Sequence, residues 1–387
     1  MSDLGGGGKP TAHNAAEGGA APKSDGSGAQ TYGLARNANE FRDLKSNGEK
    51  ITAVASSTFV SIIIVQEINA PAMCQVVFEL DTNWTDNDYK QFAPGSRLSI
   101  PDKVVQDEQL PPMYVSGLTL DGSTGSGMRS TLTVTAFDKM HFLRFGEYTT
   151  SFVQKTDTDI FNWLAKTVGL TLSPERMPQG QHPYPYVLQD NETCYDFLLR
   201  RCRQGHYQCM VKLAGETENL SIAPRLYASS AAVRLFYNYD IEAITLDMRV
   251  PTLGTTVSSR GYNISEGSPV MGTYSKNSAL CKMKGDQTAF EAAKPFGPSP
   301  VTLRRPDLND EVTLDFVARS DRERLQDTFI EGVATLRQLN FKASPGVTIA
   351  LEGLNGSFDG LYYVVKSTHR VDRNRNFTIL NLTRSGM

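Results

Sequence analysis

The sequence has few of the features that mark disulfide-bonded, metal-binding or membrane-spanning proteins. Its cysteines are few and odd in number, with no C-x-x-C pair and no histidine at zinc-finger spacing, so we expect a reduced compartment and no metal site. They stand at positions 74, 194, 202, 209 and 281. The most apolar run, Phe59–Val65, is far shorter than the roughly 20 residues that span a bilayer. The first residues, MSDLGGGGKPTAHN, lack the apolar core of a secretory signal peptide.

An excess of charge of one sign is missing as well. The formal net charge is −3, which gives no bulk electrostatic reason to bind nucleic acid or an anionic membrane. The patterns G-x-G-x-x-G, P-loop, G-x-S-x-G and H-E-x-x-H are all absent. These are the local signatures of dinucleotide, nucleotide-phosphate, acyl-transfer and zinc-peptidase chemistry, so no cofactor is expected.

Hydrolysis needs a separate argument, because a glycosidase requires only two carboxylates at a suitable separation, which sequence spacing does not fix. The available acids are Asp157, Asp159, Asp190 and Asp196, and a helix cap or an exposed helix face accounts for each. His369 lies in the alternating run YYVVKSTHRVD, which favours a half-buried histidine hydrogen-bonded across a sheet over a catalytic one. We therefore expect no catalytic residue.

The N-terminal segment, residues 1–48, is rich in Gly, Ala, Ser and Asn and holds almost no large apolar side chain before Tyr32. Such a segment cannot bury enough surface to offset the entropy of ordering, so we expect a flexible arm. As a random coil, the arm has a root-mean-square reach of roughly 35 to 40 Å, which is far enough to touch a neighbouring subunit.

Residues 49–155 have the alternating pattern of β-structure. Residues 59–65 predict a buried strand, and the stretch from Tyr114 to Asp138 predicts a hairpin around a Gly/Ser loop. Residues 156–225 have a helical period instead and predict an α/β insert. Its first helix begins at Thr156 or Asp157 and ends at Gly169. Its second helix begins at Asp190 or Asn191 and ends at Gly205, before a strand from Tyr207 to Leu213.

Residues 226–387 again predict mainly strands. Residues 252–315 give the weakest pattern in this part. A helix is expected over residues 320–340, because Ser320 and Glu323 form a capping box ahead of an apolar stripe. Three strands then complete the chain, with Gly360 at a turn that needs positive φ.

Three blocks of sequence occur in an order that resembles a known family. They read LTVTAFDKMHFLRFGEYTTSFVQKTDTDI, QDNETCYDFLLRRC and SFDGLYYVVKSTHRVD. Together they resemble the phage late control protein D family, the baseplate hub of contractile tails, and the hub half of the valine-glycine-repeat spike proteins of type VI secretion. The signature residues are Asp138, His141, Asp157, Ile160, Asp196, Phe197, Leu198, Phe358, Asp359, Gly360, Tyr362 and His369.

The resemblance implies a β-rich α+β fold in which two tail-tube-like β-barrel domains are joined by small α/β inserts. It assigns residues 49–155 to the first barrel domain and residues 226–387 to the second, with the helix at 320–340 inside the second. Three copies would then place six barrels in a ring, which matches a hexameric tube above and a trimeric spike below.

The resemblance also implies a non-enzymatic structural role. The expected partners are two further copies of the chain, an inner tube protein, a spike protein and other baseplate proteins, with assembly in the bacterial cytoplasm into a virion or injection particle. Because the sequence ends at LTRSGM, just after the last expected hub strand, we expect the spike to be a separate polypeptide. Two alternatives remain: a tail-tip cell-wall hydrolase on a hub scaffold, and a β-rich carbohydrate-binding module.

Overall fold

The computed structural model describes residues 43–100, 110–122, 129–173, 183–227, 230–354, 356–373 and 375–387. The chain divides into two units, residues 1–34 and 35–387, and every described residue lies in the second. Most of the predicted arm is therefore outside the described residues. For residues 43–48 the prediction of flexibility is wrong, because Leu44 is 1% exposed in an apolar core and Lys45–Ser46 pairs with a neighbouring strand.

The first β region contains the strands and short helices from residue 45 to residue 137. These are β1 (Lys45–Ser46), β2 (Glu49–Lys50), α1 (Ala53–Ser57), β3 (Phe59–Glu67), β4 (Met73–Glu79), α2 (Asp86–Lys90), β5 (Arg97–Ser99), β6 (Met113–Asp121) and β7 (Thr131–Phe137). Alternate residues of β3 and β4, such as Ile62, Ile64, Val76 and Phe78, are buried in one core. The predicted buried strand and the predicted hairpin are confirmed as β3 and as the antiparallel pair β6–β7.

The α/β insert follows and has a core of its own. Its elements are η2 (Lys139–Arg144), β8 (Glu147–Lys155), α4 (Asp157–Thr167), β9 (Thr171–Ser173), β10 (Tyr184–Thr193), α5 (Cys194–Gly205), β11 (Tyr207–Ala214) and β12 (Thr217–Pro224). The core begins upstream of residue 156, because Met140 and Phe152 pack into it. Thr156 caps α4 as predicted. Asp190 and Asn191 do not cap α5, because β10 stays paired with β8 as far as Thr193, which is the cap instead.

The second β region consists of strands from two separate parts of the chain. They are β13 (Val233–Phe236), β14 (Ile241–Met248), β18 (Ile330–Leu336), β19 (Thr348–Glu352), β20 (Gly360–Asp372) and β21 (Asn376–Arg384), with the single turn η5 (Gly356–Phe358) before β20. Their buried side chains form a third core. The three strands expected at the end of the chain are confirmed.

The helix predicted over residues 320–340 is confirmed only for residues 320–326, and its predicted bounds are wrong. The helix, α7, spans Glu311–Gln326 and is capped by Asp310, whereas residues 330–336 form strand β18. β18 pairs with β14 on one side and with β21 on the other, so its backbone is satisfied on both edges. A β-carbon at Gly332 would lie 2.2 Å from the Thr245 carbonyl oxygen, so the absence of a side chain at Gly332 permits the close approach of β18 to β14. Glycine also disfavours a helix at this position.

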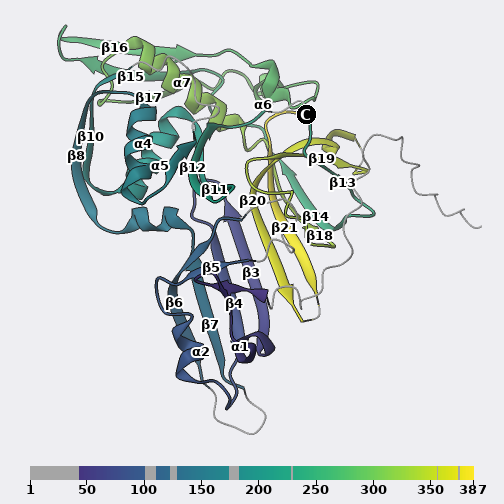
Figure 1. Cartoon of the computed structure of the whole chain (residues 1–387). Helices are drawn as coiled ribbons and strands as arrows, with labels where there is room; N and C mark the ends of the chain where they lie inside the picture. The colour runs from purple at the N-terminus through teal and green to yellow at the C-terminus, as the bar shows by residue number, and fades with distance from the viewer. Residues whose placement is uncertain are drawn as a thin grey trace, which may run out of the picture. The chain divides into compact units, whose positions relative to one another are not determined.

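Residues 252–315, where the sequence pattern was weakest, contain a small outer sheet that packs on α7. Its strands are β15 (Val257–Asn263), β16 (Ser268–Tyr274) and β17 (Val301–Arg304), in the order β16-β15-β17. Three short helical turns lie between β16 and β17: η3 (Ala279–Lys282), α6 (Ala289–Ala292) and η4 (Lys294–Phe296). Figure 1 shows α7 lying along this outer sheet.

The two β regions are joined by direct strand pairing. β20 pairs antiparallel with β3, with His369 opposite Ile64, and the described strands of both regions form one 13-stranded sheet. Figure 1 shows β20 and β21 next to β3 and β4. The predicted β-rich α+β fold, with two β regions and an α/β insert between them, is confirmed.

Candidate functional site

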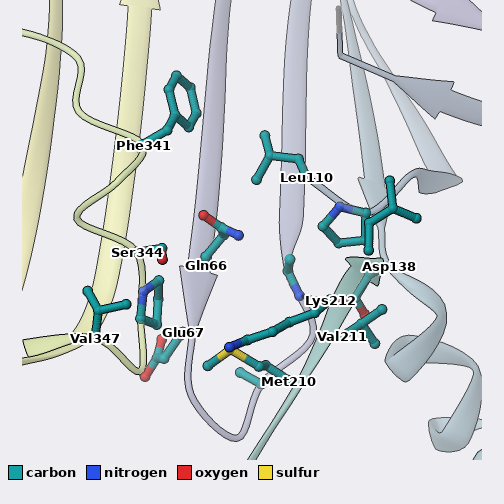
Figure 2. Close-up of a pocket in the computed structure, with 15 residues that line it drawn as sticks. Gln66, Glu67, Leu110, Asp138, Met210, Val211, Lys212, Phe341, Ser344 and Val347 are labelled. Atoms are coloured by element: carbon teal, nitrogen blue, oxygen red, sulfur yellow. Dashed lines mark hydrogen bonds between the residues drawn. The ribbon is translucent and has the colours of Figure 1, made fainter. Parts of the chain in front are cut away.

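A cleft of about 280 Å³ lies where the two β regions and the insert approach one another. Gln66 and Glu67 at the end of β3 line it, together with Met210 and Lys212 of β11 and Ser344 of the segment before β19. Figure 2 shows these side chains on β3, on β11 and on the segment before β19. Asp138, a signature residue, also lines the cleft.

Asp138 is buried where β7 turns into η2. Its two carboxylate oxygens accept hydrogen bonds from the backbone N–H groups of Ala72 and Met140, both at 2.9 Å. Burial raises the pKa of Asp138 to about 7, against the opposing effect of those hydrogen bonds. Because both oxygens are occupied by backbone donors, this carboxyl caps η2 and joins it to the residues before β4 rather than facing a substrate.

His141, three residues later, packs between aromatic rings. Its ring lies 4.4 Å from the ring of Phe137 and 5.4 Å from that of Phe145, measured between centroids. Burial and the nearby Arg144 lower the pKa of His141 below its ordinary value. This side chain is therefore a neutral packing element in the passage from the first β region to the insert.

The signature residues of α4 and α5 come together in the core of the insert. Ile160, Phe197 and Leu198 are all buried in that core. Asp157 is buried with them and accepts a hydrogen bond from Nε of Arg201 at 2.9 Å and one from the Tyr184 hydroxyl, also at 2.9 Å. The Arg201 guanidinium lies 4.3 Å from the centroid of the Tyr184 ring. This buried ion pair ties α4 to α5, and a broken pair would leave an uncompensated charge.

Two of the other three acids considered for hydrolysis form hydrogen bonds at the start of a helix, and the third is exposed. Asp159 accepts from the backbone and the hydroxyl of Thr156, which completes a capping box. Asp196 accepts from the hydroxyl of Thr193 at 2.6 Å. Asp190 lies exposed on β10. The structure therefore uses three of the four acids to begin or join helices.

Phe358, Asp359, Gly360 and Tyr362 form a tight turn that Arg384 holds from the last strand. The Arg384 guanidinium donates to the Asp359 carbonyl at 3.0 Å and lies 5.4 Å from the centroid of the Tyr362 ring. The Tyr362 hydroxyl donates to the Phe358 carbonyl at 2.8 Å. Gly360 has φ +140°, as the sequence predicted, and a β-carbon there would lie 2.7 Å from Arg384 Nη2.

His369 lies on β20, the strand that begins at this turn, and it is fully buried rather than half-buried. Its Nδ1 is 3.0 Å from the Thr378 hydroxyl on β21, and its ring stacks on Phe341 with 4.1 Å between centroids. Burial lowers the pKa of His369 to about 3. The histidine is therefore neutral near pH 7 and hydrogen-bonded across the sheet, as the framework interpretation requires.

Sequence reasoning missed a charged group that we call the junction cluster: His206, Arg225, Tyr227 and Asp327. It joins the end of α5, the segment after β12 and the end of α7. Asp327 accepts from the Tyr227 hydroxyl at 2.7 Å, and its other oxygen lies 2.7 Å from His206 Nε2 and 3.1 Å from Arg225. Arg225 also donates to the Thr383 hydroxyl at 2.8 Å. No local motif marks these residues, since His206 and Asp327 are far apart in sequence.

These clusters stabilise helix ends, turns and contacts between regions. Within the described ranges, no group of three or more His, Cys, Asp or Glu side chains is placed to hold a metal ion. No helix in the same part of the chain is both long and apolar enough to cross a membrane.

Comparison with solved structures shows which fold this is. The chain is similar to the 43 kDa tail protein of prophage MuSo2 from Shewanella oneidensis, with 12% identity, a TM-score of 0.63, and coverage of 88% of this chain and 97% of that one. It is equally similar to a tail protein of Neisseria meningitidis MC58, with 11% identity, a TM-score of 0.63, and coverage of 88% and 95%.

A third similar structure is the E. coli c3393 protein, described as a component of the type VI secretion system with structural similarity to bacteriophage T4 tail proteins. The identity is 11%, the TM-score is 0.54, and the coverage is 89% of this chain and 77% of that one. At these identities the likeness shows the fold alone. No curated protein sequence matches.

The fold expected from the resemblance, that of phage tail and type VI secretion proteins, is confirmed. The specific relation to late control protein D stays a prediction, because the family model that matches is a different one. It is described as the Alg8 N-terminal domain, and it matches residues 39–373. Since this match spans most of the sequence, the chain belongs to the Alg8 N-terminal domain family.

Proposed function

We propose that the chain is a structural baseplate hub of a contractile phage tail or a related injection system, in which three copies join a hexameric inner tube to a trimeric spike. The observation that carries the proposal is the extent of the shared fold, which covers 88% of this chain and 97% of a prophage tail protein. The resemblance of three sequence blocks to late control protein D supports the same role.

The arrangement of strands is consistent with a ring. Each chain contributes two β regions with separate cores, so three chains supply six such regions, the number that a hexameric tube presents. Among the described strands, β14 pairs only with β18, which leaves its other edge available for hydrogen bonding. A sheet edge of this kind is a template for pairing with another chain.

The proposal includes a non-enzymatic role and a set of partners. Asp157, Asp159 and Asp196 serve the insert, so the geometry gives no specific support to a hydrolase. The partners are two further copies, an inner tube protein, a spike protein and other baseplate proteins. Assembly takes place in the bacterial cytoplasm, and the product is part of a virion or injection particle.

Light scattering after size-exclusion chromatography tests the assembly. We expect a particle of three times the 42.5 kDa chain mass, at a fraction that rises with protein concentration. A monomer at every concentration up to the solubility limit would contradict the trimer.

A peptidoglycan-release assay separates the hub from the hydrolase. We expect no release by the wild-type protein. Release that disappears in Asp190→Asn, which changes an exposed acid of β10, while the thermal midpoint of that variant stays close to wild type, would favour the hydrolase instead.

A further inference from the structure

The outer sheet, β16-β15-β17, has one covered face and one open face. α7 covers the first, where Val257 and Ser259 are fully buried and a β-carbon at Gly272 would lie 2.3 Å from the backbone of Leu314. Since side chains alternate along a strand, the residues between these positions point away from α7. Figure 1 shows α7 against these strands.

The strand registers place the open-face residues in rows. Arg304 of β17 is the partner of Arg260 on β15, and Arg260 is in turn the partner of Met271 on β16. In the next row, Tyr262 is the partner of Pro269. Two arginines are therefore paired on neighbouring strands of the open face, beside exposed apolar residues.

The two arginines have no counter-ion in the described part of the chain, where no carboxylate lies within 4.0 Å of either. The next residue, Arg305, shows the contrast, because it pairs with Asp321 at 2.7 Å on the covered side. Like charges directly opposite each other destabilise a sheet. The open face therefore carries a charge repulsion that folding alone does not relieve.

Large apolar side chains accompany the arginines. Tyr262 is 48% exposed, Met271 is 49% exposed, and Ile264, in the turn between β15 and β16, is 81% exposed. Arginine, tyrosine and methionine are the residue types enriched where proteins bind one another. An occupant that supplies only negative charge would leave this apolar surface in water.

We propose that the open face of the outer sheet docks an acidic segment of a partner protein, whose carboxylates pair with Arg260 and Arg304 while its apolar side chains cover Tyr262 and Met271. Two carboxylates remove the arginine repulsion, and each matches the planar fork of a guanidinium. The exposed side chains of Tyr262 and Met271 favour a protein segment, which can cover them, over a partner that supplies only negative charge. The proposal does not depend on the trimeric hub.

Fluorescence anisotropy with the full chain tests this surface. The probe is a fluorescein-labelled peptide of alternating glutamate and valine, compared with the same peptide carrying lysine in place of glutamate. We expect binding of the acidic peptide only, and a loss of about tenfold or more in the R260Q/R304Q double variant. The matched control is R97Q/R370Q, which removes two exposed arginines from other strands. Equal binding of both peptides, no binding of the acidic one at millimolar concentration, or an equal loss in the control variant overturns the proposal.

A second variant separates lost binding from lost folding. R304E replaces the cross-strand repulsion with an attraction, so its thermal midpoint should rise by about 1 to 2 °C while binding of the acidic peptide falls. A fall in the thermal midpoint would contradict the repulsion on which the proposal rests. A single-stranded oligothymidine that binds the wild type more tightly than the acidic peptide does, and that does not bind the R260Q/R304Q variant, would indicate a nucleic-acid partner. That result would overturn the proposal of a protein partner.

Discussion

Two regions of the molecule shield a histidine from most of the solvent, and the pKa of the histidine shifts in opposite directions in the two regions. In the junction cluster, burial alone would lower the pKa of His206, but the charge and hydrogen bond of Asp327, together with Glu323, outweigh it and raise the pKa to about 9. In the large sheet, His369 has a threonine and a phenylalanine as neighbours, and burial lowers its pKa to about 3.

The difference shows that burial does not by itself decide the charge of a histidine. A carboxylate within hydrogen-bond distance makes the protonated form part of the fold, and an uncharged neighbour makes the neutral form part of it. The two regions should therefore lose stability at opposite ends of the pH scale, and mutations in them should have effects of different size.

The largest effect is expected when the carboxylate of the junction cluster is removed. Asp327→Asn leaves the buried Arg225 and protonated His206 without their counter-charge, so the free energy of unfolding should fall by about 3 to 5 kcal/mol. Urea denaturation near pH 7 measures this fall. The matched control is Asp247→Asn, which removes an exposed partner of Arg249 and should cost about 0 to 1 kcal/mol. Equal urea midpoints for the two variants would show that the junction cluster contributes little to stability.

The next effect is a loss of stability in alkali at the junction cluster. The folded pKa of His206, about 9, lies above its ordinary value of 6.5, so its contribution is complete below pH 6.5 and disappears as the pH rises through 9. The free energy of unfolding should fall by about 3 kcal/mol over that window. His206→Gln should lack this slope. A wild-type curve with the same slope as the variant would refute the assignment.

An opposite loss of stability, in acid, is expected in the sheet. The folded pKa of His369 is about 3, below its ordinary value of 6.5, so the unfolded state binds the extra proton and stability falls as the pH drops below 6.5. At pH 4.5 the loss should be about 2 to 3 kcal/mol. His369→Leu should have a flatter acid limb in pH-dependent urea denaturation. If the variant loses as much stability as wild type between pH 6.5 and 4.5, other groups cause the loss.

A substitution that strains the backbone tests the stability of the sheet without altering any charge. Gly360→Val adds a β-branched side chain at φ +140° and against Arg384, and we expect a cost of about 2 kcal/mol in thermal unfolding. Gly117→Val is the control, because a β-carbon there meets nothing within 4 Å and the backbone is not in the left-handed region. If both substitutions cost the same, the turn before β20 has no special role in the stability of the sheet.

Local signals in the sequence predicted the elements that depend on neighbouring residues. The cap at Thr156, the end of its helix beside Gly169 and the hairpin of β6 and β7 all follow from short-range patterns, and the structure has each of them. The α7 prediction was wrong because residues 330–336 have an apolar pattern that fits either a helix or a strand. Pairing with β14 and β21, which lie far away in sequence, decides in favour of the strand.

The candidate site was predictable only in part, for the same reason. The sequence pointed to Asp157, Gly360 and His369 but not to Arg201 or Arg384. Arg201 donates to Asp157 and Arg384 donates to the Asp359 carbonyl, and in each case the partner lies far away in sequence. The junction cluster and the facing arginines of the outer sheet were both missed. A contact between residues that lie far apart in sequence produces no local motif, so only the folded structure shows it.

The pairing of β3 with β20 has a consequence for the order of synthesis. Ile64 leaves the ribosome about 300 residues before its partner His369 is made. Until then, the edge of β3 that will receive β20 has no partner strand from this sheet, and an open edge is a site of wrong pairing between nascent chains. Contacts between such distant residues also slow folding. We therefore expect the first β region to reach its final form only after translation of the C-terminal strands.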